Sequence, residues 1–223
     1  YPYGGGAGMV LKPEPIFEAI KNLPLKYKPK IVIMTPQGTV FNQKTALELA
    51  GEQELVFICG HYEGFDERIR SLADLELSIG DYVLTGGELA AMVVIDATAR
   101  LIPGVLGEQE SFEDDSFAKG LLEYPQYTRP PVYEGLEVPA VLLSGDHAKI
   151  NSWRRKEALR KTLLSRPDIF DPEILKPDDF PLLRDLMNES REILNLSHLW
   201  LSHEPPPKVR RSKKTRGQDF EKE

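Results

Sequence analysis

The chain has 223 residues, of which 41% are hydrophobic and 28% are charged, with a formal net charge of −7 at pH 7. This length allows one full domain and a smaller second one. No apolar run approaches the roughly 20 residues that span a bilayer, and no secretory signal is visible, so we expect a cytoplasmic protein with no membrane partner. The single cysteine, Cys59, excludes an internal disulfide and a multi-cysteine zinc site.

The first half of the chain alternates apolar strand patterns with helical ones, after a glycine-rich loop over residues 1–9. The pattern predicts helices over 16–21, 42–50, 66–72 and 88–101, and strands over 30–34, 54–59 and 81–84. Buried, β-branched strands that alternate with helices are typical of an α/β fold, in which helices cover both faces of a mostly parallel sheet.

Each predicted strand ends in a loop rich in proline or glycine, over residues 34–38, 60–64 and 84–87. The third loop alone is weak evidence for a ligand site, because many glycine-rich loops are only tight turns. In an open α/β sheet, however, ligands bind outside the carboxyl ends of the strands. We therefore expect all three loops to line one ligand crevice.

The second half predicts a smaller, mainly helical domain. Residues 103–116 are polar and lack periodicity, which is typical of a linker or lid. A short strand is predicted over 138–143, and helices over 148–164 and around 180–187. The expected domains are an α/β ligand-binding domain over 1–110, a flexible linker or lid over 111–130, a mainly helical domain over 131–195, and a disordered basic tail over 196–223.

Basic residues gather in the predicted helix 148–164, although the whole chain is acidic. Such a helix can contact nucleic-acid phosphates, and the alternative is an ordinary solvated face. The candidate RNA-binding residues are Arg154, Arg155, Lys156 and Arg160.

Eight motifs occur along the chain in a fixed order. They are Pro-Tyr-Gly-Gly-Gly-Ala-Gly-Met at 2–9, Pro-Gln-Gly at 36–38, Cys-Gly-His-Tyr-Glu-Gly-Phe-Asp-Glu-Arg at 59–68, the segments 78–89 and 100–107, Asp-Ser-Phe at 115–117, Tyr-Thr-Arg-Pro at 127–130 and Leu-Ser-Gly at 143–145. Together they strongly resemble the bacterial tRNA (guanine-N1-)-methyltransferases of the TrmD type, from residue 1 to about 167. The resemblance also implies that a first strand and helix precede this chain in the family.

The resemblance implies a SPOUT-class α/β domain whose carboxyl-terminal part is threaded into a trefoil knot. It further implies a homodimer with active sites at the subunit interface, and the anticodon stem-loop of tRNA as partner. The knot loops hold S-adenosylmethionine in this family. Carried over position by position, the methyl-donor site is Met34, Pro36, Gly60, Tyr62, Glu63, Ile79, Gly80, Tyr82, Leu84, Gly86 and Gly87.

The family methylates N1 of the guanosine immediately 3′ of the anticodon, position 37. Since N1 of neutral guanine carries a proton, a general base must remove it, and Asp115 matches that base. Arg100 matches the cation that stabilises the charge developing on O6. From the residues alone, a solvated loop carboxylate is the default interpretation of Asp115, with Asp114 as the alternative base. A salt bridge to Asp96, four residues earlier, is the favoured interpretation of Arg100.

The sequence does not predict a bound metal ion at His61, because no second His or Cys occurs at the sequence spacing typical of metal ligands. The resemblance allows Mg²⁺, held through Glu63 and Asp115. The functional alternatives are a methyltransferase of RNA ribose 2′-oxygens on the same fold, a ligand-binding domain without chemistry, and an RNA-binding module in which the α/β domain is only a scaffold.

Overall fold

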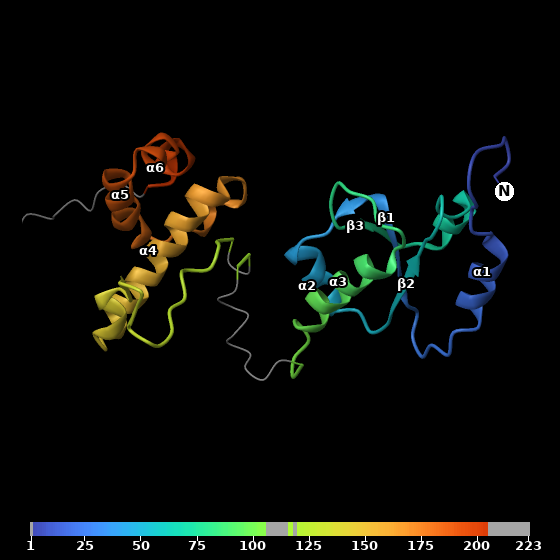
Figure 1. Cartoon of the computed structure of the whole chain (residues 1–223), viewed down its shortest axis with the longest axis horizontal. Coiled ribbons are helices and arrows are strands. Elements are labelled where there is room, and N and C mark those ends of the chain that lie inside the picture. The colour runs from blue at the N-terminus through green and yellow to red at the C-terminus, as the bar shows by residue number, and fades with distance from the viewer. Residues whose placement is uncertain (1, 106–115, 118–119, 205–223) are drawn as a thin grey trace, which may run out of the picture. The chain divides into compact units, whose positions relative to one another are not determined.

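The chain divides into two compact units, Tyr1–Asp114 (unit 1) and Asp115–Glu223 (unit 2), each described here by itself (Figure 1). The structure is a computed structural model, and it describes residues 2–105, 116–117 and 120–204. Within these ranges, no helix is both long and apolar enough to cross a membrane.

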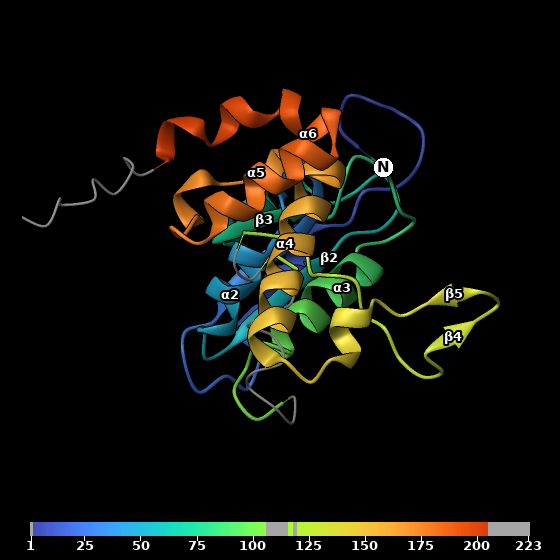
Figure 2. The ribbon, with the colours of Figure 1, turned by 90° about the vertical axis from the view of Figure 1, so that its left-hand side faces the viewer.

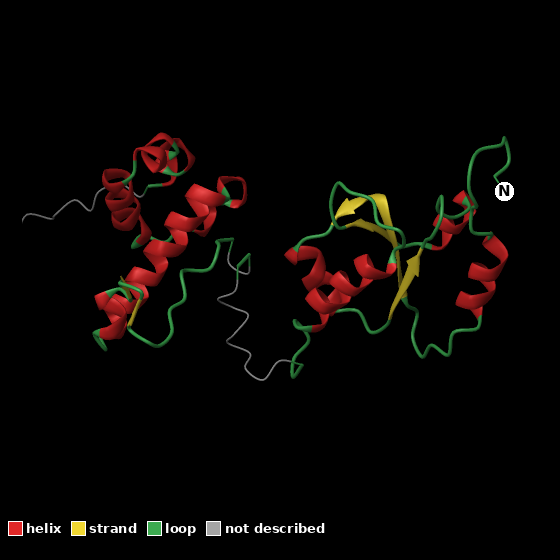
Figure 3. Cartoon of the chain, in the orientation of Figure 1, coloured by secondary structure: helices red, strands yellow, loops and turns green. Residues whose placement is uncertain are grey.

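Unit 1 is built on a parallel sheet of three strands in the order β2-β1-β3, as Figure 3 shows in yellow. Its strands are β1 (Lys30–Val40), β2 (Leu55–Cys59) and β3 (Leu75–Ser78), and its helices are α1 (Pro13–Lys21), α2 (Gln43–Ala50), α3 (Glu88–Ala99) and a 3₁₀ helix over Glu67–Leu72. The predicted α/β class with a parallel sheet is confirmed.

Alternation along the central strand explains why helices cover both faces of this sheet. Successive strand residues point to opposite faces. Val32 and Met34 pack with buried residues of α2 and α3, whereas Ile33 between them packs with Ile58 and with Ile69 of the 3₁₀ helix. Residues of α1 also cover this second cluster.

The third strand was predicted six residues too late. The structure places β3 over Leu75–Ser78, and residues 81–84 form an exposed turn in which Val83 is 84% exposed. Residues 82–84 have a strand-like composition, but they pair with no strand among the described residues. Leu77 and Ser78 are buried against β1 instead, so the alternating sequence Leu-Glu-Leu-Ser is the true strand.

The first strand is longer than predicted, and its register changes where a loop was expected. Leu77 of β3 pairs with Met34 and again with Thr39, so the residues between them form a bulge within β1. Pro36 has no N–H to donate to a ladder. At Gly38 the neighbouring strand lies so close that a Cβ atom would be 2.5 Å from the backbone nitrogen of Leu77.

Unit 2 is mainly helical, with a small hairpin that stands apart from its helices in Figure 2. Its helices are α4 (His147–Ser165), α5 (Asp179–Glu189) and α6 (Arg191–Asn195), with 3₁₀ turns at Ala140–Leu143, Pro167–Ile169, Pro172–Ile174, Ser197–Leu199 and Leu201–His203; the hairpin is β4 (Val132–Tyr133) and β5 (Leu136–Glu137). The strand predicted over 138–143 is wrong, because Pro139 fixes the backbone for a 3₁₀ turn.

One hydrophobic core unites unit 2. It contains Leu159 and Leu163 of α4, Leu183 of α5, and two residues from segments expected to lie outside the helical domain. Leu121, in the expected linker, is 6% exposed, and Trp200, in the expected tail, is 1% exposed. The described residues on both sides of the expected domain 131–195 are therefore part of the same packed unit.

We expect Asp179→Ala to lower the free energy of unfolding of unit 2 by about 3 kcal/mol. Asp179 is 3% exposed, and its carboxylate accepts two hydrogen bonds from Arg155, at 2.8 and 2.7 Å. Removing the carboxylate leaves the half-buried guanidinium without this partner. Urea unfolding followed by circular dichroism measures the change.

The matched control is Asp168→Ala, which breaks the exposed Arg166–Asp168 pair. Exposed pairs contribute roughly 0–1 kcal/mol, so its unfolding midpoint should barely move. Equal losses of unfolding free energy in the two variants would show that burial does not make the Arg155–Asp179 pair more important than the exposed pair.

Candidate active site

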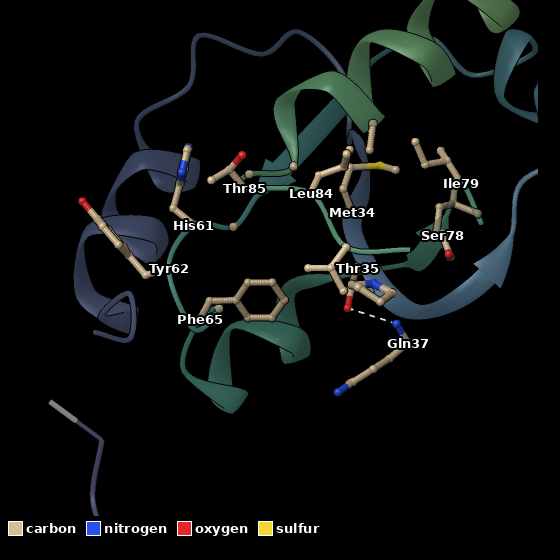
Figure 4. A pocket seen from close by; sticks show the side chains of 18 of the residues that line it. Met34, Thr35, Gln37, His61, Tyr62, Phe65, Ser78, Ile79, Leu84 and Thr85 are labelled. Atoms are coloured by element: carbon tan, nitrogen blue, oxygen red, sulfur yellow. Dashed lines mark hydrogen bonds between the residues drawn. The ribbon is translucent and has the colours of Figure 1, made fainter. Parts of the chain in front are cut away.

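A cavity of about 460 Å³ opens at the carboxyl ends of the three strands of unit 1. Figure 4 shows labelled side chains from all three strand ends around it. Neighbouring parallel strands bring their carboxyl ends to one edge of a sheet, which explains why the three loops meet. Eleven residues expected to contact the methyl donor line this cavity: Met34, Pro36, Gly60, Tyr62, Glu63, Ile79, Gly80, Tyr82, Leu84, Gly86 and Gly87.

The second and third loops approach closely through their backbones. Gly87 donates a hydrogen bond from its N–H to the carbonyl of Gly60, at 3.0 Å. A Cβ atom at Gly87 would lie 2.9 Å from the Cα of Cys59, closer than real Cβ atoms come. Only glycine fits there, and both Gly60 and Gly87 line the cavity.

The N-terminal segment of the chain holds the second loop in place. The N–H of Glu63 donates to the carbonyl of Met9 at 3.1 Å, and that of Leu11 donates to the carbonyl of Gly64 at 3.0 Å. Tyr62, immediately before Glu63, has a positive φ of 60° and is 66% exposed. Met9 and Leu11 therefore hold in place the part of the cavity wall that carries Tyr62 and Glu63.

Arg70 also lines the cavity, although the sequence did not indicate it as a site residue. Its guanidinium donates to Glu67 at 3.0 Å and also to Glu76 and Gln37, and it lies 5.3 Å from the ring centroid of Phe65. It thereby joins the bulge of β1, the strand β3 and the loop after β2. The Glu67–Arg70 spacing of three residues is the sequence signal that could have found it.

His61, which lines the cavity, pairs with a carboxylate at the start of α3. The Nε2 atom of His61 lies 2.6 Å from Oε1 of Glu88, in the first turn of α3. The backbone N–H of Glu88 and then the His61 side chain lower the pKa of this carboxyl. Because both side chains are about half exposed, the pair orders the loop without adding much stability.

Cys59 has no sign of nucleophilic activation. Burial, followed by the charge of Glu88, raises the pKa of its thiol, whereas a reactive cysteine needs a lowered one. Its side chain packs against the hydrophobic cluster beneath the cavity.

The loop after β2 continues into a capped 3₁₀ helix whose cap depends on pH. The Asp66 carboxylate accepts from the Arg68 side chain at 2.7 Å and from its backbone N–H at 3.0 Å, which lowers the pKa of Asp66 to about 2 from 3.8. A lowered pKa stabilises the fold fully above the unfolded value, and this contribution is lost as the pH falls from about 4 towards 2.

We therefore expect Asp66→Asn to make the urea midpoint of unit 1 less sensitive to pH between about 4 and 2. The difference between the variant and the unaltered protein should be largest near neutral pH and shrink in acid. A difference that stays constant with pH would show that the carboxylate charge does not act.

Of the two expected catalytic residues, only Arg100 lies in the described part of the chain. Asp115, like its alternative Asp114, lies outside the described residues. Arg100 is the C-cap residue of α3, and its N–H donates to the carbonyl of Asp96 at 3.3 Å. Ala90, in the first turns of α3, lines the cavity. A rise of 1.5 Å per residue then separates Arg100 from Ala90 by about 15 Å along the helix.

Three of the four expected RNA-binding cations form ion pairs within unit 2. Arg155 pairs with Asp179 and Lys156 with Glu189 at 2.7 Å each, while Arg160 binds Glu189 at 2.6 Å and also pairs with Glu157. The pairs with Asp179 and Glu189 join α4 to α5. Lys156 and then Arg160 lower the pKa of Glu189.

Arg154, the fourth, lies over the ring of Tyr124, with its Cζ 4.9 Å from the ring centroid. The expected phosphate contacts remain a prediction for all four residues.

The possible magnesium ligands are not brought together by what the structure describes. Glu63 lines the cavity, and Asp115 falls outside the described ranges. Over residues 2–105, 116–117 and 120–204, no group of three or more His, Cys, Asp or Glu side chains could hold a metal ion.

Comparison with known proteins shows the family to which this chain belongs. The family model described as "tRNA (Guanine-1)-methyltransferase TrmD" matches residues 1–172 of this chain. The chain is similar to proteins named "tRNA (guanine-N(1)-)-methyltransferase" from three bacteria. That of Desulfitobacterium hafniense (strain Y51) is 61% identical over 211 residues, which cover 94% of this chain and 80% of that protein.

That of Dehalococcoides mccartyi (strain CBDB1) is 60% identical over 192 residues, covering 84% and 77% of the two chains. That of Brevibacillus brevis (strain 47) is 59% identical over 191 residues, covering 85% and 79%. The family match therefore includes the whole of unit 1, with its cavity, and continues into unit 2.

Proposed function

We propose that this chain, which belongs to the tRNA (guanine-1)-methyltransferase TrmD family, transfers a methyl group from S-adenosylmethionine to N1 of the guanosine at position 37 of tRNA. The observation that carries the proposal is the cavity of unit 1. Eleven residues that the family resemblance assigns to the methyl donor come from three separate loops, and all of them line this one cavity.

The residues present fit such a donor. A volume of about 460 Å³ lies within the range of small-molecule sites, roughly 300–1,000 Å³. Met34, Ile79 and Leu84 offer apolar surface, and the glycine turns offer backbone groups at close range. The carboxylate of Glu63 favours a positively charged ligand. When bound, S-adenosylmethionine supplies an electrophilic methyl group on a cationic sulfur.

The chain's own residues then have two tasks at the guanine. Asp115 accepts the N1 proton, which frees an electron pair on N1 in the plane of the ring. Arg100 stabilises the negative charge that proton loss places on O6. Alignment of the two reacting groups supplies most of the remaining acceleration.

We further propose a homodimer with active sites between the subunits, on a SPOUT domain with a trefoil knot. Two features of α3 support the dimer. Its apolar residues Leu89, Met92, Val93 and Ile95 are 47–62% exposed, an unusual apolar face for a solvated helix. In addition, Arg100 lies about 15 Å along α3 from the cavity, so a second copy is the natural source of this cation.

The test is methyl transfer from labelled S-adenosylmethionine to tRNA transcripts with guanine or adenine at position 37. We expect product only with guanine, and nucleoside mass spectrometry should identify N1-methylguanosine. A methyl group on the ribose would overturn the N1 assignment. Donor binding without transfer would support the alternative of a ligand-binding domain, and absence of donor binding that of a scaffold.

A further inference from the structure

Unit 2 contains a second cavity that the methyl-donor chemistry does not use. It also has a volume of about 460 Å³ and lies between the segment 124–131, the turn before α4, and α4 itself. Its aromatic walls are Tyr124, Tyr127 and Trp153, and Ile150 forms a buried apolar part of the lining. The rings of Tyr127 and Trp153 lie 6.3 Å apart at an interplanar angle of 55°.

Arg154 gives this aromatic cavity a polar group with unused capacity. Its guanidinium lies over the Tyr124 ring, and its Nε atom is buried without a hydrogen-bond partner among the described residues. A buried donor without a partner is costly, so this part of the Arg154 side chain is not yet satisfied by the protein itself. Arg155, next in sequence, has no such capacity, since it is engaged with Asp179.

The charge of the lining points to an anionic partner. Two arginines, Arg129 and Arg154, line the cavity, and in the described part of the chain no aspartate or glutamate does so. This is a local reversal in a chain whose net charge is −7. Flat aromatic rings beside guanidinium groups are the combination on which unstacked nucleobases bind.

We propose that this cavity binds one unstacked nucleobase of the RNA substrate, a base other than the one that is methylated. The rings of Tyr127 and Trp153 provide stacking surface, and the guanidinium of Arg154, which lines the cavity, provides a positive charge beside the nucleotide. The assignment rests on the proposed function only in taking tRNA as the source of the base. It gives unit 2 a contact with a base, in addition to contacts with phosphates.

The test uses the full chain and an anticodon stem-loop RNA. The protein has two tryptophans, of which Trp200 is 1% exposed in the core of unit 2. Quenching of tryptophan fluorescence by the RNA should therefore come from Trp153, and Trp153→Phe should remove it. Tyr127→Leu should weaken RNA binding by roughly tenfold, while the dependence of affinity on salt stays unchanged. The matched control is Tyr133→Leu on the hairpin, because Tyr133 is 64% exposed and does not line the cavity.

A series of stem-loops, each with a single abasic nucleotide, identifies the bound base. At that one position, removal of the base and Tyr127→Leu should not be additive, because both delete the same stacking contact. Additive losses at every position would overturn the inference, as would failure of the unaltered protein to bind the stem-loop. A changed monomer–dimer equilibrium in Tyr127→Leu with unchanged RNA affinity would instead assign the cavity to a second copy.

The outcome is separate from that of the proposed function. Methyl transfer by the unaltered protein with additive losses would retain the enzyme and reject the base-binding cavity. Non-additivity at one base without any methyl transfer would do the reverse.

Discussion

The Asp115→Ala protein is expected to bind S-adenosylmethionine as tightly as the unaltered protein and to methylate tRNA about 10²- to 10⁴-fold more slowly. The physical reason is that N1 of guanine has no free electron pair in the ring plane until its proton leaves. Without a positioned base, water must accept that proton. Single-turnover methyl transfer measures the rate, and calorimetry with the donor measures the affinity.

Asp114→Ala is the matched control, since it removes the same charge one residue earlier. We expect its turnover to stay within a few-fold of the unaltered protein. If Asp114→Ala were the inactive variant and Asp115→Ala the active one, the base would be Asp114. If both variants kept full turnover, the proton would leave by another route, and the assignment of a general base to this segment would be wrong.

The Gly87→Ala protein is expected to lose stability in unit 1 by about 1–3 kcal/mol and to bind the methyl donor more weakly. The new Cβ atom would lie 2.9 Å from the Cα of Cys59 and 3.2 Å from the backbone nitrogen of Gly60. Neither contact can be relieved by rotation of a side chain, so the third loop must move away from the second. Thermal unfolding and donor calorimetry measure the two effects.

Gly51→Ala makes the same chemical change where the backbone allows it. Gly51 has a φ of −82° at the end of α2, and a Cβ atom there would lie 3.4 Å from the nearest carbonyl oxygen. This variant should be unchanged or stabilised by up to about 1 kcal/mol, because alanine restricts the unfolded chain. Equal behaviour of the two glycine variants would argue against the close approach at Gly87.

The cavity of unit 1 was predictable even though one of its strands was not. The third strand was expected over 81–84, and the structure has it over Leu75–Ser78. The prediction of a crevice survived because it depended on the glycine-rich loop, which follows the strand in either position. Arg70 could not be predicted as a cavity residue, because its position depends on contacts between separate elements. Its partners Gln37 and Glu76 lie in other elements, and only the folded sheet brings them to one guanidinium.

The basic helix shows where a sequence pattern is ambiguous. A cluster of cations on one helix suggests a phosphate-binding face, yet Arg155, Lys156 and Arg160 meet carboxylates of α4 and α5. Asp179 and Glu189 are 24 and 33 residues away from their first partners, Arg155 and Lys156, so helical spacing could not reveal the pairs. Arg154, next to them in the sequence, instead lies over the ring of Tyr124, which is 30 residues away.

The sequence by itself determined the α/β class, the parallel sheet of unit 1, the helical character of unit 2, and the three loops that line one cavity. These features follow from the local alternation of apolar residues and from glycine and proline, which act over a few residues. Only the tertiary structure decided which cations are paired, that Leu121 and Trp200 belong to one core, and that Arg154 lines a second, aromatic cavity. Such contacts join residues far apart in the chain, and their energies depend on burial, which no local pattern encodes.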